Sequence, residues 1–97
     1  MEPLATLNFK GQEIDLWPLF YGNGRPAIFA KSKYGEPIGK LTVNIPEVAL
    51  KDAEICVKTW SDGEELSEAC RQLDIFEDTG RRVPTGWVEA EIWKVKK

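Results

Sequence analysis

The residues that most directly suggest chemistry are Asp78-Thr79-Gly80, the tripeptide that carries the catalytic carboxylate in aspartic proteases. In those enzymes two carboxylates share one proton, so a short chain must bring its Asp to a two-fold axis on a buried loop. Here Arg81 and Arg82 follow directly and would keep both carboxylates ionised, which removes the shared proton. The sequence therefore predicts a turn, in which the Asp and Thr side chains bond to nearby backbone and the Gly adopts a positive φ.

Other kinds of catalysis have little support in the composition. The chain has no histidine, which removes Ser-His and Cys-His nucleophile pairs and nearly all catalytic zinc sites. Two cysteines, Cys56 and Cys70, cannot complete a structural zinc site alone. Gly22-Asn23-Gly24 lacks the following helix and lysine of a phosphate-binding loop, and no Asp/Glu pair has a recognisable acid–base spacing. We therefore expect a protein that is not an enzyme and uses no metal or cofactor.

The length and charge of the chain limit its class. Its 97 residues are enough for one domain, residues 1–97, with a core of its own. No run of about 18 apolar residues and no secretory signal is present, so we expect a cytoplasmic protein with reduced thiols. Residues 51–78 are acidic and residues 79–97 are basic. This predicts either an ordinary solvated surface or an acidic face beside a basic strip that steers a basic partner.

Alternation of apolar and polar side chains predicts six strands, over residues 4–10, 13–21, 27–33, 38–45, 54–60 and 87–95. Gly22-Asn23-Gly24 is a strong hairpin signal, because Asn and Gly tolerate positive φ. Residues 75–86 contain two turn signals and are expected to form a long irregular connection. In the last strand the core face is expected to carry Val88, Ala90 and Ile92, with Trp93 facing away.

One helix is predicted over residues 61–74. Ser61 and Glu64 have the spacing of a capping box, and apolar residues at helical spacing form one stripe from Leu66 to Leu73. The elements together predict an α+β fold, a curled antiparallel sheet of about six strands with one α-helix packed on one face. In that arrangement Cys70 faces the sheet while Cys56 lies on the far side, out of disulfide reach.

Several segments resemble a family of small uncharacterised proteins that are found in phages, plasmids and conjugative elements of bacteria. The likeness covers roughly residues 20–95, through TVNIP (42–46), ICVKTW (55–60), the acidic helix and TGRRVPTGWVEAEIW (79–93). Its most specific part is Thr79-Gly80-Arg81 followed by Pro84-Thr85-Gly86. The family has no established activity. The resemblance implies a mobile-element origin, where small antagonists of host defence, including anti-CRISPR proteins, are common.

The four tryptophans of the chain are expected opposite or beside the predicted core faces. They would form either a second small core or a partner surface, since aromatic and arginine side chains dominate binding hot spots. Arg81 and Arg82 adjoin Trp87 in the sequence, which favours a partner-binding cluster made of Trp60, Arg81, Arg82 and Trp87. For Arg81 the alternative is a structural clamp on its own loop.

Two further binding modes follow from charge. Lys31, Lys33 and Lys40, with Phe29 and Tyr34 nearby, could form a platform on the sheet for single-stranded nucleic acid. The acidic residues of the helix and its flanks could instead mimic the phosphates of a nucleic acid, or simply form a solvated face; they are Asp62, Glu64, Glu65, Glu68, Asp74, Glu77 and Asp78.

The sequence thus predicts a small non-enzymatic binding protein of phage or mobile-element origin. We expect it to block a host or defence protein by steric occupation, with a nucleic-acid-binding module using the lysine hairpin as the alternative. We expect a monomer or a weak dimer, because Lys96 and Lys97 oppose edge-to-edge pairing of the final strand.

Overall fold

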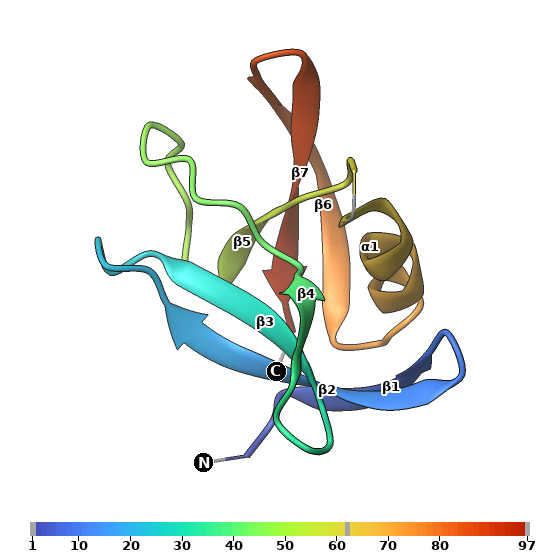
Figure 1. Cartoon of the computed structure of the whole chain (residues 1–97). Coiled ribbons are helices and arrows are strands. Elements are labelled where there is room, and N and C mark those ends of the chain that lie inside the picture. Colours follow the sequence, from blue (N-terminus) through green and yellow to red (C-terminus); the bar gives the residue numbers. More distant parts are fainter. Residues whose placement is uncertain (1, 62, 97) are drawn as a thin grey trace.

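The computed structural model describes residues 2–61 and 63–96, and within them it contains seven strands and one helix (Figure 1). They are β1 (Ala5–Phe9), β2 (Gln12–Phe20), β3 (Pro26–Ser32), β4 (Pro37–Lys40), β5 (Glu54–Val57), α1 (Gly63–Arg71), β6 (Phe76–Thr85) and β7 (Val88–Val95). Asp62 and Lys97, to which the sequence analysis gave roles, lie outside the described residues. The α+β class is confirmed. The helix that is described is too short to span a membrane.

The strands form two antiparallel sheets, so the prediction of one curled sheet of about six strands is wrong. The first sheet has the order β1-β2-β3-β4 and the second has the order β5-β7-β6. After β4 the chain leaves the first sheet, and a bridge between Thr42 and Val57 joins it to β5. The amide of Val43 donates to the carbonyl of Cys56 (3.1 Å), next to this bridge. Beyond this junction the two sheets diverge.

Strand β6 occupies residues that the sequence analysis expected to be irregular. Its pattern is hard to recognise because it is an edge strand whose register shifts between Asp78 and Arg82. In this bulge Gly80 has a φ of 84°, the amide of Gly80 donates to Asp78 Oδ1 (2.9 Å), and the amide of Arg81 donates to Thr79 Oγ1 (3.2 Å). The local bonds predicted for this tripeptide are therefore present, in a β-bulge and not in a chain reversal.

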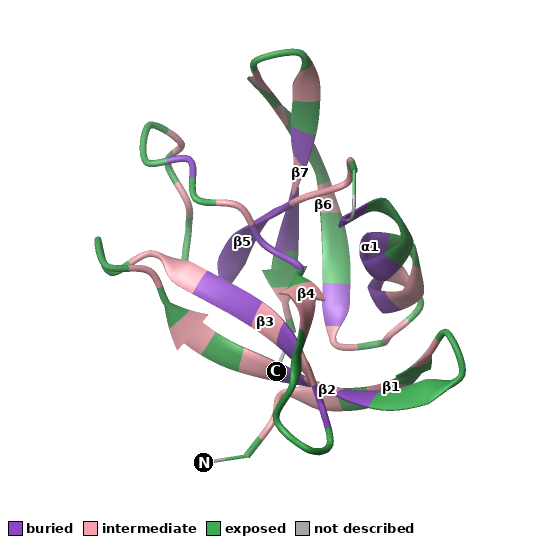
Figure 2. Cartoon of the chain, in the orientation of Figure 1, coloured by how far each residue is buried: buried purple, intermediate pink, exposed green. Residues whose placement is uncertain are grey.

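The main core lies between the two sheets and beneath α1, and Figure 2 shows its buried positions on β3, β5, β6, β7 and the inner face of the helix. It contains Ile14, Leu16, Ile28, Ala30, Leu41, Ile55, Val57, Leu66, Cys70, Phe76 and Trp93. The prediction that Trp93 faces away from the core is wrong, since its side chain is 1% exposed and its ring centroid is 5.4 Å from that of Phe76.

A second, smaller core lies on the opposite face of the three-stranded sheet. Ile45, Cys56, Ala90 and Ile92 form it, and the loop between β4 and β5 covers it. Both faces of β7 are therefore buried. Cys56 and Cys70 belong to different cores and are unpaired, as predicted. Burial raises the pKa of the Cys70 thiol to about 12, so this thiol stays protonated at neutral pH.

The helix is shorter than predicted, and its start differs from a capping box. Ser61 has a left-handed φ of 57°, outside the extended region that an N-cap residue adopts. It contacts the first turn through its carbonyl, which accepts the amide of Glu64 (3.3 Å). The first helical residue, Gly63, packs directly on the chain that leaves β5. A Cβ placed there would lie 2.7 Å from the carbonyl oxygen of Lys58 and 2.9 Å from its Cγ.

We predict that Gly63→Ala lowers the free energy of unfolding by about 1–3 kcal/mol, because backbone must move to admit the methyl group. Gly22→Ala is the matched control, since a Cβ at Gly22 meets no atom within 4 Å. Urea unfolding of the two variants beside the wild type measures both effects. Equal stability of the two variants would show that the helix start tolerates a side chain.

Candidate functional site

The hairpin formed by β6 and β7 projects beyond the body of the molecule (Figure 1). Thr85 and Val88 are its last paired residues, so Gly86 and Trp87 form a two-residue turn. Gly86 has a φ of 65°, as the first central residue of a type II′ turn requires. Trp87 is 103% exposed, which leaves its whole indole in water at the tip.

Trp60, the second tryptophan of the predicted cluster, has a different environment. It is half-buried and packs against the second core. The preceding residue, Thr59, donates its hydroxyl to the carbonyl of Glu89 on β7 (3.3 Å), so this segment lies beside the hairpin. Trp60 therefore supports the hairpin from one side and exposes only part of its ring.

Arg81 holds the loop between β4 and β5. Its guanidinium forms an ion pair with Glu54 (2.7 Å) and donates to the carbonyl of Ala49 (3.0 Å). From the other side of the same loop, Arg25 donates to the carbonyls of Ile45 (3.0 Å) and Val48 (2.7 Å). The structural reading of Arg81 is thus the one that the contacts support, although it clamps a distant loop and not its own.

Arg82 is engaged within its own sheet. Its two terminal nitrogens bond to the two oxygens of Asp78 (3.0 Å each), and Nη2 lies 3.7 Å from Glu91 Oε2. Arg71, at the end of α1, reaches the same two carboxylates at 3.2 and 2.8 Å. Both arginines of the predicted basic strip, Arg81 and Arg82, are therefore engaged in ion pairs. Of the four residues proposed as a partner-binding cluster, only Trp87 is fully exposed.

Hydrogen bonds and ion pairs lower the pKa values of two carboxyl groups. The pKa of Asp78 is lowered, mainly by its bonds to Arg82 and also by the amide of Gly80 and the charge of Arg71. The pKa of Glu54 is lowered, mainly by the amide of Lys51, which donates to its Oε1 (2.9 Å), and also by Arg81. Both groups are therefore ionised at neutral pH, and the arginines around Asp78 favour its charged form.

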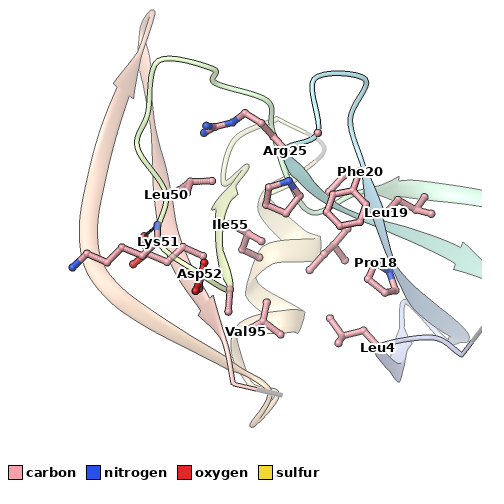
Figure 3. A pocket seen from close by; sticks show the side chains of 16 residues that line it. Leu4, Pro18, Leu19, Phe20, Arg25, Leu50, Lys51, Asp52, Ile55 and Val95 are labelled. Carbon is pink, nitrogen blue, oxygen red and sulfur yellow. Dashed lines mark hydrogen bonds between the residues drawn. The ribbon is translucent and has the colours of Figure 1, made fainter.

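An apolar cavity of about 530 Å³ opens where the two sheets diverge (Figure 3). Its walls come from β2, β3, β5, the loop before β5 and the two ends of the described chain, and include Leu4, Pro18, Phe20, Leu50, Ile55 and Val95. Arg25, Lys51 and Asp52 lie at its rim. Sequence reasoning missed this feature, because its residues come from five separate segments and share no pattern.

The lysines of the predicted nucleic-acid platform lie on and beside the first sheet. Tyr34 is 78% exposed in the turn between β3 and β4, and Lys33 Nζ lies 5.3 Å from its ring centroid. Lys40 Nζ lies 5.8 Å from the ring centroid of Phe29, and Lys31 is half-buried on β3. The structure thus brings Lys31 and Lys40 together around Phe29 and places Lys33 and Tyr34 at the end of the same hairpin.

Within residues 2–61 and 63–96, no group of three or more metal-ligating side chains is present. Comparison of the chain with protein-family models, with curated proteins and with solved structures gave no match.

We predict that Arg81→Ala lowers the melting temperature by a few degrees, because it leaves the Glu54 carboxylate and the Ala49 carbonyl without this partner. Lys94→Ala, at an exposed position on β7, is expected to change stability by no more than about 0.5 kcal/mol. Thermal unfolding followed by circular dichroism tests both. If Arg81→Ala melts like the wild type, Arg81 is available for a partner and does not act as a clamp.

We predict that acid destabilises the protein partly through Asp78. The folded-state pKa of this group lies below its ordinary value of 3.8, so its stabilisation is present above that value and is lost as the pH falls through the lower one. Asp78→Asn should therefore be less stable at pH 7 and should lose less stability between about pH 5 and pH 2. Urea unfolding across this range, with Asp74→Asn as the matched control, measures the difference; parallel curves for Asp78→Asn and wild type would contradict it.

Proposed function

We propose that this protein is a non-enzymatic binding protein that docks on another protein through the tip of the β6–β7 hairpin. The observation that supports the proposal is the full exposure of Trp87. An indole left in water forgoes the burial energy that large aromatic side chains give. Tryptophan is also among the residues most enriched at the centres of protein interfaces.

The extended pairing of the hairpin also favours docking through its tip. Paired residues extend from Phe76 and Val95 at its base to Thr85 and Val88 beside the turn. The ion pair of Arg82 with Glu91 connects β6 to β7 below the tip, and that of Arg82 with Asp78 braces the bulge within β6. A contact residue on a preorganised support loses little conformational freedom on binding, so more of the interface energy appears as affinity.

The other residues of the predicted cluster take supporting roles in this proposal. Arg81 and Arg82 position the hairpin and the adjoining loop, and Trp60 provides a half-buried apolar flank. The exposed acidic residues Glu64, Glu65 and Glu68 of α1 would steer a basic partner at long range. The cavity between the sheets lies at the far end of β7 and has no part in this contact.

The class of partner follows from the resemblance to phage and mobile-element proteins. We propose a host or defence protein that is blocked by occupation of its surface, as an anti-CRISPR inhibitor would act. No catalytic step is needed for such an effect.

We predict that Trp87→Ala abolishes capture of this partner, with affinity reduced by at least about 30-fold, the loss expected of a hot-spot residue. Tyr34→Ala is the matched control, because Tyr34 is also an exposed aromatic residue in a hairpin turn. Tagged wild type and both variants are incubated with bacterial lysate, and the captured proteins are compared by mass spectrometry.

The melting temperature of Trp87→Ala should remain that of the wild type, since the side chain contacts no core. The proposal fails if Trp87→Ala captures the same protein as the wild type, or if Tyr34→Ala loses it equally.

A further inference from the structure

The face of the first sheet that points away from the main core carries two aromatic rings side by side. Ile14, Leu16, Ile28 and Ala30 point into the core, so the residues that alternate with them point outward. Trp17 on β2 and Phe29 on β3 are direct cross-strand partners on that outer face. The ring of Tyr21 lies 6.4 Å from that of Phe29 and extends the aromatic row.

Lysines surround this aromatic row. Lys40 on β4 is the cross-strand partner of Phe29, and Lys31 follows Phe29 by two residues on the same face. Lys33 lies beyond it in the turn. Within the described residues none of these three lysines forms an ion pair, whereas Arg71, Arg81 and Arg82 all do. Asp15, the cross-strand partner of Lys31, accepts a hydrogen bond from Thr6 (2.6 Å).

Two shallow hollows border this aromatic row. One, of about 330 Å³, is lined by Trp17, Leu19 and Lys33 together with Asp15. The other, of about 270 Å³, is lined by Phe29, Pro37, Lys40 and Lys58. Lys31 lines both. Each hollow thus combines the flank of an aromatic ring with at least one ammonium group.

We infer that this outer face binds a single-stranded nucleic acid. Bases stack on Trp17 and Phe29, and Lys31, Lys33 and Lys40 pair with phosphates between and beside them. Surfaces that bind single strands combine aromatic rings, on which the bases stack, with cations that pair with the phosphate backbone. A duplex does not present its base faces, so stacking of this kind selects a single strand. The inference goes beyond the proposed protein docking and uses a different surface.

The test is fluorescence anisotropy with a labelled oligothymidylate of about 12 nucleotides, titrated with the wild-type protein at several KCl concentrations. Three phosphate contacts predict that log Kd rises with log[KCl] with a slope of about 2. A duplex of equal length should bind more weakly. Absence of binding at low salt, or equal affinity for the duplex, overturns the inference.

Substitutions distinguish the contribution of base stacking to affinity from that of charge. Phe29→Leu should weaken binding about fivefold or more, and Phe29→Tyr, which keeps a ring, should retain it. The double variant Lys31→Ala/Lys40→Ala should lower the salt slope by about 1.4. Lys51→Ala/Lys94→Ala, which removes two exposed lysines elsewhere, should keep the wild-type slope.

These outcomes remain informative if an aromatic variant fails to fold, because the lysine variants alter exposed or half-exposed side chains. An unchanged salt slope in Lys31→Ala/Lys40→Ala contradicts the inference, as does an equal loss in both lysine pairs. Trp87→Ala should bind the oligonucleotide like the wild type, so this inference and the proposed protein docking can be tested independently.

Discussion

The indole of Trp93 is the group on which the arrangement of the second sheet depends. It lies buried in the main core beside Phe76 of β6, where an unpaired N–H would cost about 1–3 kcal/mol. Glu91, two residues earlier on the same face of β7, accepts that N–H at 2.9 Å. A carboxylate so close to a core needs cations. Arg71 provides one at 2.8 Å, with its guanidinium 5.1 Å from the Trp93 ring centroid, and Arg82 provides another.

Arg71 and Arg82 meet this requirement, and the other two arginines, Arg25 and Arg81, also make contacts that hold the fold together. Arg71 joins the end of α1 to β6 and β7, while Arg25 and Arg81 hold the β4–β5 loop over the second core. The planar guanidinium suits such multiple contacts, whereas lysine remains as a hydrated point charge on the surface. Three lysines that form no ion pair within the described residues, Lys31, Lys33 and Lys40, lie on or beside the first sheet.

Much of the local structure could be predicted from sequence because local patterns determine it. The strands predicted over residues 13–21 and 27–33 match β2 and β3 to within one residue at each end, the stripe from Leu66 identifies the helix, and Gly86 marks the last turn. Strand β6 could not be predicted, since a bulge interrupts it. The orientation of Trp93 could not be predicted either. Both faces of β7 are buried, and alternation alone does not show which face points into the main core.

The candidate site could be predicted only in part, because several of its contacts join segments that are far apart in the sequence. Trp87 follows a turn signal, so its exposure is a local property. The partner of Arg81, Glu54, lies 27 residues away in the sequence, and no spacing rule indicates such a pair. Likewise Trp17 and Phe29 meet only through the register of β2 and β3. Sequence could identify the residue types of both surfaces but not which of them are already committed to other contacts.

The direction of β7 has a practical consequence for handling the molecule. The strand runs from Val88, beside the turn, to Val95, which lines the same cavity as Leu4. Both ends of the described chain therefore lie a full strand length away from Trp87. An affinity handle or a biotin joined at either end would immobilise the protein on a bead or a sensor chip with its hairpin directed toward solution.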